Sequence, residues 1–338
     1  MSQYTLSSRS LLVTQGDPAG IGLDITLKAW AQRDALALPP FTLLATPDYV
    51  RERAHKLKID VPLAINATHP NFNTHLPIIA LKSTSHDAPK CHAGTPDLAH
   101  ASAIIEAIET GVEQILKGQA RALITNPIAK YVLAQSGFVH AGHTEFLAAL
   151  CSNKDEAITP VMMIWSEQLA VVPLTIHVAL ERVPSLITHE ALLKAARIIH
   201  HDMRMRFGIE RPHIAVAGLN PHAGEYGYIG TEDDHIIRPA IVQLRSEGLL
   251  ITGPHSADTL FHQAAREHYD VALCMYHDQA LIPVKTLCFD TGVNVTLGLP
   301  IIRTSPDHGT AFDKAGTGLA NPSSFIEAVR LAHRLSKS

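Results

Sequence analysis

The feature that most constrains the fold is a repeated alternation of short apolar runs with longer amphipathic stretches. Short runs of this kind are typical of buried strands, and the stretches between them have the three-to-four-residue spacing of helices. The expected strands are 11–14, 41–45, 61–65, 77–81, 122–125, 161–164, 170–176, 214–219, 271–276 and 292–297. The expected helices are one beginning at 23, then 95–116, 190–207, 231–248, 258–268 and one from about 322. Such alternation predicts an α/β protein with a mostly parallel sheet covered on both faces.

The length of the chain predicts two domains. Its 338 residues are more than one hydrophobic core usually serves. No low-complexity linker separates two halves, so the domains are expected to exchange chain segments. We place the first domain at 1–135 plus 290–338 and the second at 136–289.

Charge and cysteine usage narrow the class of protein. The formal net charge is −4 and no Lys/Arg-rich run occurs, which argues against a nucleic-acid partner. A small anionic substrate needs only a local cluster of cations and stays open. No apolar stretch reaches the roughly 18 to 20 residues that span a bilayer. The four cysteines form no CxxC pair, which favours reduced thiols and a cytoplasmic location.

Three histidines stand at or just past the carboxyl ends of expected strands: His177, His222 and His277. That edge of a parallel sheet is where loops converge on ligands, and three neutral imidazoles are the ligand set of a catalytic divalent metal. Asp258 and Asp278 lie close enough in sequence to support the imidazoles or to approach a substrate. A histidine at a strand end can instead be held by a loop hydrogen bond, so the pattern alone leaves both roles open.

Two segments hold candidate anion-binding residues. His143 and Thr144 follow Gly142 at the expected start of a helix, where backbone N–H groups also point outward; a plain helix cap is the alternative. Lys285, Asn294 and Arg303 are polar residues in or beside apolar runs and need partners, which a phosphate, a carboxylate or an internal salt bridge would supply. The turn 16–22 matches neither glycine-rich nucleotide motif and is read as a tight turn between strand and helix.

Six motifs, in order along nearly the whole chain, resemble the PdxA family of 4-hydroxythreonine-4-phosphate dehydrogenases. They are Gly-Asp-Pro-Ala-Gly-Ile-Gly at 16–22, His-Thr-Glu-Phe-Leu at 143–147, Gly-Leu-Asn-Pro-His-Ala-Gly-Glu at 218–225, Met-Tyr-His-Asp-Gln at 275–279, Gly-Val-Asn-Val-Thr-Leu-Gly-Leu-Pro at 292–300 and Ile-Arg-Thr-Ser-Pro-Asp-His-Gly-Thr-Ala at 302–311.

The resemblance implies a fold and a reaction. The fold would be a two-domain α/β/α architecture like that of isocitrate and isopropylmalate dehydrogenases, with the active site in the interdomain cleft. The reaction would be NAD- or NADP-dependent oxidation of 4-phosphooxy-L-threonine, with loss of CO₂ to give 3-amino-2-oxopropyl phosphate, in pyridoxal 5′-phosphate (vitamin B6) biosynthesis. The family is a homodimer with shared active sites, and we expect the second domain to carry the dimer interface.

The resemblance also implies roles for individual residues. The metal ligands would be His177, His222 and His277, holding zinc, magnesium or cobalt. The substrate contacts would be His143, Thr144, Lys285, Asn294 and Arg303. The loop 307–316 looks like the adenine-side loop of isocitrate and isopropylmalate dehydrogenases, which assigns the dinucleotide to His308, Gly309, Ala311 and Asp313. The general base is left open among Asp258, Asp278 and Lys285.

Two segments depart from the family pattern, and other functions stay open. The residues after His177, 178–182, differ from the expected pattern, and Asn126 and Ala129 replace residues common in the family while Lys130 matches. The alternative substrates are a threonate or erythronate phosphate and an aromatic cis-dihydrodiol carboxylate. A metal-dependent hydrolase and a non-catalytic metal-stabilised dimer are the other two readings.

Overall fold

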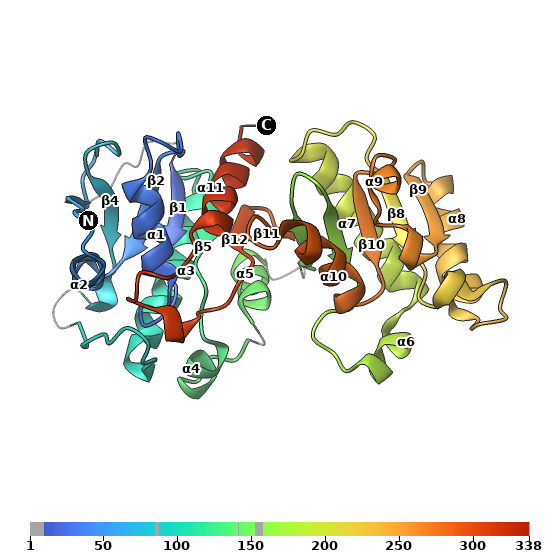
Figure 1. The fold of residues 1–338 in the computed structure, drawn as a ribbon, viewed down its shortest axis with the longest axis horizontal. Helices are drawn as coiled ribbons and strands as arrows, with labels where there is room; N and C mark the ends of the chain where they lie inside the picture. Colours follow the sequence, from blue (N-terminus) through green and yellow to red (C-terminus); the bar gives the residue numbers. More distant parts are fainter. Residues whose placement is uncertain (1–9, 85–87, 141, 153–157, 338) are drawn as a thin grey trace. The chain divides into compact units, whose positions relative to one another are not determined.

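A computed structural model describes residues 10–84, 88–140, 142–152 and 158–337, and it divides into two compact units. The first unit contains residues up to 160 together with 299–337, and the second contains 161–298. Figure 1 shows the C-terminal helix α11 (red) beside the blue and green elements of the first unit. Both units combine strands and helices, so the chain is an α/β protein, with one unit built from two separated segments.

The two compact units divide at 160/161 and 298/299, whereas the domains expected from the sequence divide at 135/136 and 289/290. The first boundary falls later because helix α5 (His143–Cys151) buries Phe146 and Leu147 in the same core as α3 (Ala101–Leu116). The second falls later because strand β11 (Val293–Leu297) pairs with β6 (Val161–Trp165). Strand pairing and burial therefore decide to which unit an element belongs, and a run of apolar residues in the sequence predicts neither.

The sheet of the first unit is parallel, in the order β3-β4-β2-β1-β5-β12. Its strands are β1 (Leu11–Thr14), β2 (Phe41–Ala45), β3 (Leu63–Ile65), β4 (Leu76–Ala80), β5 (Ala122–Thr125) and β12 (Ile302–Pro306). All residues of β1, β2 and β5 are buried, which explains why these strands are apolar without alternation.

Helices cover both faces of this sheet. The helices are α1 (Gly22–Ala31), α2 (Pro47–Leu57), α3, α4 (Lys130–Gln135), α5 and α11 (Ser323–Leu335), with short 3₁₀ turns at Lys82–Thr84, Leu98–His100 and Phe312–Lys314. Leu12 and Leu44 pack with α3 and α5 in one core cluster. Side chains alternate along a strand, so Phe41 faces the other way, where its ring meets Phe325 of α11 edge-on at 6.0 Å between centroids.

The sheet of the second unit has the order β11-β6-β7-β10-β8-β9. Its strands are β6, β7 (Ala170–Pro173), β8 (His213–Ala217), β9 (Leu250–His255), β10 (Val271–Cys274) and β11. β6 runs antiparallel to both of its neighbours, whereas β7, β10, β8 and β9 are parallel. The expectation of a mostly parallel sheet is thus met except around β6.

Helices and short helical turns connect the strands of the second unit. They are the turn Leu180–Arg182, α6 (Val183–Leu186), α7 (His189–Met205), the turn η4 (Pro221–Gly224), the π turn Asp233–Ile237, α8 (Arg238–Ser246), the turn η6 (Ala257–Thr259), α9 (Gln263–Arg266) and α10 (His277–Cys288). The single helix expected over 258–268 is wrong, because that stretch forms η6 and α9 with a break between them.

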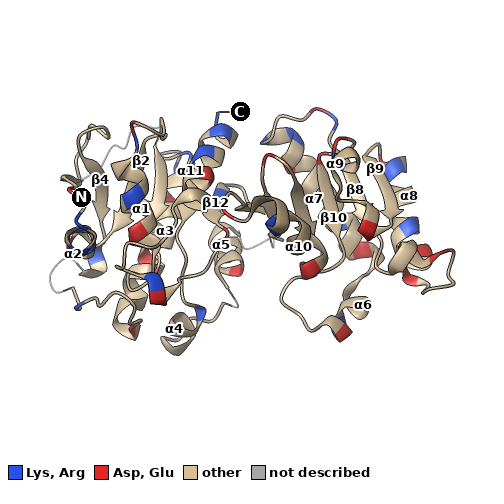
Figure 2. Cartoon of the chain, viewed as in Figure 1, with Lys and Arg blue, Asp and Glu red and all other residues tan. Residues whose placement is uncertain are grey.

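The state of the cysteines, the character of the helices and the distribution of charge complete the description of the fold. Cys91, Cys151, Cys274 and Cys288 are all free thiols, as the sequence predicts. Among the described residues, no helix has both the length and the apolar character needed to cross a membrane. Figure 2 shows basic and acidic residues interspersed over the helices of both units.

Candidate active site

The three histidines of the predicted metal site follow three neighbouring strands of the second unit. β7, β10 and β8 are adjacent and parallel, with β10 in the middle. His177 follows β7, His277 opens α10 after β10, and His222 lies in η4 after β8. All three segments therefore leave the same edge of the sheet.

The imidazoles of His177 and His277 lie side by side, with ring centroids 5.6 Å apart. Backbone and side-chain bonds beyond the strand ends hold the two segments together. Leu174 N donates to Cys274 O over 2.8 Å, and the buried Thr175 hydroxyl donates to Met275 O over 2.8 Å. These bonds continue the pairing of β7 with β10 up to the two histidines.

His222 is placed by a tight turn. His222 and Ala223 have φ values of 55° and 52°, the left-handed region that is unfavourable for residues with a Cβ. The buried carboxylate of Asp233 stabilises this turn by accepting bonds from Leu219 N (2.9 Å) and Asn220 N (3.0 Å). The His222 side chain is 63% exposed, with Nδ1 3.9 Å from a Glu225 carboxylate oxygen.

The structure brings two of the three predicted ligands together but not the third. Within the described stretches of the chain, no three His, Cys, Asp or Glu side chains are grouped closely enough to hold a metal ion. The donors nevertheless suit a divalent cation, because three imidazoles at one sheet edge are chemically the right set.

Asp278 and Asp258 contact different parts of this region. Asp278 Oδ1 lies 2.7 Å from His277 Nδ1. A hydrogen bond in which Nδ1–H donates leaves the lone pair on Nε2, as a metal-ligating imidazole requires. Asp258 accepts a 2.6 Å bond from the Ser256 hydroxyl, and this bond is the largest of the effects that hold the Asp258 pKa below its ordinary value.

Lys285 and Asn294, the other predicted polar contacts in this unit, lie on separate elements. Lys285 is half-buried in α10, the helix that His277 opens, and its Nζ lies 5.8 Å from the centroid of the Phe289 ring. Asn294 is half-buried in β11, where it pairs with Ile164 of β6.

A cationic cluster lies at the carboxyl edge of the first unit's sheet. Arg303 is buried in β12 beside β5, and its Nε and Nη2 both donate to the hydroxyl of Thr125, over 2.9 and 2.6 Å. Burial lowers the pKa of Arg303 to about 10, so its guanidinium stays charged at neutral pH. Sequence reasoning gave Thr125 no role; the only signal was a threonine closing a buried strand.

His143 and Thr144 stand at the N-terminus of α5, close to this guanidinium. Burial, followed by the charges of Arg303 and Lys130, lowers the His143 pKa well below its ordinary value, so the ring is neutral. Its buried Nε2 has no hydrogen-bond partner among the described residues. The Lys130 side chain lies beside Gly142, the residue before His143, because a Cβ added to Gly142 would be 3.2 Å from Lys130 Nζ. Helix N–H groups, Arg303 and Lys130 together favour an anion.

The loop predicted to hold the dinucleotide packs against the β1–α1 turn. Ile21 N donates to Thr310 O over 2.9 Å, and Gly316 N donates to Asp24 Oδ1 over 2.7 Å. Gly20 permits this approach, because a Cβ there would lie 2.9 Å from Thr310 O. Within the loop, His308 Nδ1 lies 3.1 Å from Gly309 O, Ala311 is left-handed with φ of 39°, and Asp313 is in the turn Phe312–Lys314.

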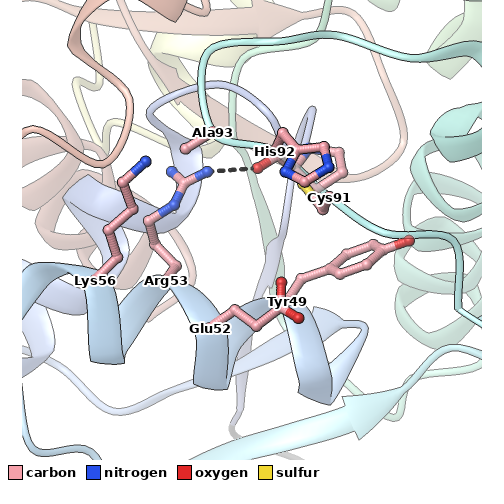
Figure 3. A pocket seen from close by; sticks show the side chains of 8 residues that line it. Tyr49, Glu52, Arg53, Lys56, Cys91, His92 and Ala93 are labelled. Carbon is pink, nitrogen blue, oxygen red and sulfur yellow. Dashed lines mark hydrogen bonds between the residues drawn. The ribbon is translucent and has the colours of Figure 1, made fainter.

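A cavity of about 340 Å³ adjoins this loop, and sequence reasoning missed it. It is lined by Pro18, Tyr49, Glu52, Arg53, Lys56, Cys91, His92 and Ala93. Figure 3 shows Arg53 and Lys56 side by side on α2, with Cys91 and His92 across from them. Arg53 is buried, ion-paired with Asp24, and donates to Pro18 O over 2.8 Å. Lys56 reaches the loop, since a Cβ on Gly316 would lie 2.9 Å from its side chain.

Comparison with known proteins identifies the family. The family described as pyridoxal phosphate biosynthetic protein PdxA matches residues 38–332. The chain is 54% identical over 334 residues to 4-hydroxythreonine-4-phosphate dehydrogenase of Methylorubrum extorquens, covering 97% of this chain and 95% of that protein. The crystal structure of 4-hydroxythreonine-4-phosphate dehydrogenase from Klebsiella pneumoniae superposes with a TM-score of 0.87 at 33% identity, covering 97% of this chain and 99% of that one.

A solved structure with a different name is also similar. It is a terephthalate 1,2-cis-dihydrodiol dehydrogenase from Burkholderia xenovorans, with a TM-score of 0.65, 27% identity, and 96% and 97% of the two chains covered. The fold and the matching relatives define an α/β dehydrogenase. The chain belongs to the PdxA family of pyridoxal phosphate biosynthetic proteins.

Proposed function

We propose that this enzyme catalyses the NAD- or NADP-dependent oxidation of 4-phosphooxy-L-threonine and its decarboxylation to 3-amino-2-oxopropyl phosphate. The supporting observation is the buried guanidinium of Arg303, with the neutral His143 ring and the exposed Lys130 close to it, in a chain 54% identical to a protein named for a phosphorylated hydroxythreonine. A buried guanidinium beside a helix N-terminus suits a phosphate group.

In this proposal the first unit binds the anionic end of the substrate. Arg303 presents its fork in an orientation fixed by Thr125, and the N–H groups at the start of α5 complete the contacts with Thr144. His143 is neutral and its unpartnered Nε2 is available to the substrate. Lys285 and Asn294 are proposed as further substrate contacts, so that the reacting carbon is held in one geometry.

His177, His222 and His277 would hold a divalent ion such as zinc, magnesium or cobalt. When bound, the ion would polarise the substrate oxygens while the nicotinamide accepts a hydride. Asp278 orients His277 through its 2.7 Å contact with Nδ1, and the Asp233 carboxylate holds the turn that carries His222. The protein therefore prepares the imidazoles through hydrogen bonds made by neighbouring carboxylates.

The dinucleotide would bind the loop that carries His308, Gly309, Ala311 and Asp313. This loop is fixed by Ile21 and Asp24, and the cavity beside it gives room for part of a nucleotide. Lys56 supplies a positive charge at the junction of cavity and loop, which favours a phosphate-bearing cofactor.

Three residues are candidate general bases. Asp278 contacts His277, Asp258 accepts a hydrogen bond from Ser256, and Lys285 is half-buried in α10. Separate substitutions of the three residues, each compared by its loss of kcat, test which one is the base.

A second substrate class is favoured by one observation. The similarity to a terephthalate cis-dihydrodiol dehydrogenase, at 27% identity, fits oxidation of an aromatic cis-dihydrodiol carboxylate. A carboxylate would then occupy the Arg303 cluster. The higher identity to phosphate-named relatives makes the threonine phosphate our first choice over this class and over threonate or erythronate phosphates.

We also propose a cytoplasmic homodimer in which the second unit forms the interface. The four free thiols suit a reducing compartment. Exposed aromatic side chains at Tyr226 and Tyr228, in the loop after His222, are of the kind that interfaces bury.

Absorbance at 340 nm tests the proposal. The purified enzyme with added divalent metal, NAD⁺ or NADP⁺ and one candidate alcohol at a time should form reduced cofactor fastest with 4-phosphooxy-L-threonine. Faster turnover of a cis-dihydrodiol carboxylate would transfer the assignment to that class. No cofactor reduction with any of the alcohols would rule out the reaction proposed here.

A further inference from the structure

Gln279 makes two side-chain hydrogen bonds that join different strand ends of the second unit. Its Oε1 accepts from Met275 N over 2.7 Å, and its Nε2 donates to Gly218 O over 2.8 Å. Met275 follows β10 and Gly218 follows β8. One amide side chain therefore bridges the two chain segments that lead to His277 and His222.

The Oε1 end of Gln279 ties the beginning of α10 to the residue before its N-cap. Gln279 is the third residue of this helix, the position from which Glu or Gln reaches the N-cap N–H in a capping box. Here Oε1 instead accepts from Met275 N, one residue before the N-cap Tyr276. His277 is the first residue of the same helix, and the preceding Tyr276 makes no side-chain capping bond. The accepted bond from Met275 thus fixes where the helix starts, and with it the position of His277.

The Nε2 end of Gln279 reaches the base of the His222 turn. The turn folds back closely over Gly218, because a Cβ on Gly218 would lie 2.8 Å from the Cα and Cβ of Ala223. Gly218 N is also tied to β9 through His255 O, at 2.7 Å. The hydrogen bond that Gln279 donates to Gly218 O therefore holds the residue against which the His222 turn packs.

We propose that Gln279 is a positioning residue that sets the turn of His222 against the helix start of His277. The proposal rests on the proposed function in that the two histidines are taken as ligands of one divalent ion. Gln279 acts through its hydrogen bonds to the backbone at 218 and 275. Glutamine suits this task because one side chain must accept at one end and donate at the other.

Two substitutions separate this role from simple helix capping. Gln279→Glu keeps an acceptor for Met275 N and adds a negative charge that favours a helix N-terminus, but it places a carboxylate oxygen against Gly218 O. Gln279→Met has a similar shape and removes both bonds. Gln168→Glu is the matched control, since the exposed Gln168 precedes β7, at the opposite end of that strand from His177.

Metal affinity is the first measurement. Titration of the metal-free proteins with Zn²⁺ or Co²⁺ should show Gln279→Glu and Gln279→Met binding roughly ten- to a hundred-fold more weakly than the unsubstituted protein and Gln168→Glu. Equal affinity in all four proteins would overturn the role of Gln279. Failure of the unsubstituted protein to bind either ion would contradict the proposed metal centre instead.

Hydrogen exchange of the metal-free proteins tests the role independently of any ion. In Gln279→Glu, amides of 219–224 should exchange faster while those at the start of α10 stay protected; in Gln279→Met both segments should exchange faster. Unchanged exchange over 219–224 in Gln279→Glu would reduce Gln279 to a helix cap and refute the proposal.

Discussion

The hydroxyl of Thr125 accepts two hydrogen bonds from Arg303, one from Nε and one from Nη2, at 2.9 and 2.6 Å. Both residues are buried, and they belong to the neighbouring parallel strands β5 and β12. These bonds set the rotation of the guanidinium, so the strand pair orients the cation that we assign to the substrate phosphate.

Removal of the Thr125 hydroxyl should therefore loosen Arg303 without changing its charge. Thr125→Val keeps the branched shape, and losing hydrogen bonds to a charged group costs about 1.5–3 kcal/mol. We expect the KM for the phosphorylated substrate to rise roughly ten- to a hundred-fold. Thr125→Ser should restore a near-normal KM; if Val and Ser variants behave alike, the hydroxyl does not orient Arg303.

Substitution of Arg303 should weaken binding of the phosphorylated substrate more than binding of NAD⁺. Arg303→Ala removes the fork, and Arg303→Lys keeps a charge but not its two-pronged geometry. Both variants should weaken binding of the phosphate-bearing substrate by at least about tenfold, with alanine worse, and leave the KM for NAD⁺ nearly unchanged. An unaltered KM for the phosphorylated substrate would count against the assigned role.

Removal of divalent metal should stop turnover without unfolding the protein. The histidine segments are held by bonds that need no ion, such as Thr175 to Met275 and Asp233 to Leu219. After dialysis against chelator we expect no activity, an almost unchanged far-UV circular dichroism spectrum, and recovery when metal is added back. Loss of the spectrum would make the site structural.

The pH dependence of stability should reveal Asp17. Burial raises the pKa of this carboxyl from 3.8 to about 6, so the folded state favours the protonated form. The resulting stabilisation is complete below about pH 3.8 and is lost as the pH rises through about 6, a total of about 3 kcal/mol. The Asn side chain of the Asp17→Asn variant does not titrate. The melting temperature of this variant minus that of the unsubstituted protein should therefore increase as the pH is raised from 5 to 8.

The control for that comparison is Asp34→Asn, which changes the same charge on a side chain that is 73% exposed. Its difference in melting temperature should stay nearly constant over this pH range. A constant difference for Asp17→Asn as well would show that Asp17 ionises normally.

Gly20 should control the dinucleotide loop. Because an added Cβ would lie 2.9 Å from Thr310 O, Gly20→Ala must displace the loop, and overpacking of this kind costs about 1–3 kcal/mol. We expect the KM for NAD(P)⁺ to rise several-fold while the KM for the phosphorylated substrate changes little. The opposite pattern would separate this loop from the cofactor.

Much of the architecture was predictable because several strands are buried on both faces. β1, β2, β5 and β10 coincide with or fall within expected apolar runs. β9 and β12 were not predicted. β12 contains the buried polar residues Arg303, Thr304 and Ser305, of which Arg303 and Thr304 bond to Thr125 and Ala328, and β9 contains Gly253 and Pro254. A strand whose polar groups are satisfied by neighbours gives no apolar signal.

The candidate site was predictable in its residues more than in its geometry. The pairing of His177 with His277 follows from strand adjacency, which sequence order alone does not reveal, since β10 lies between β7 and β8. The separate position of His222 comes from the left-handed turn at 222–223. Thr125, Gln279 and the cavity beside α2 depend on contacts between residues far apart in the chain, so no local pattern marks them.

The first unit is built from two separated chain segments, and this has a consequence for folding during translation. Phe325 and strand β12, which complete one face and one edge of that unit's sheet, come from the last forty residues of the chain. The second unit is one uninterrupted segment that emerges from the ribosome before them. We expect the second unit to finish its core first, while the earlier part of the first unit waits, with Phe41 uncovered, until the segment 299–337 has been translated.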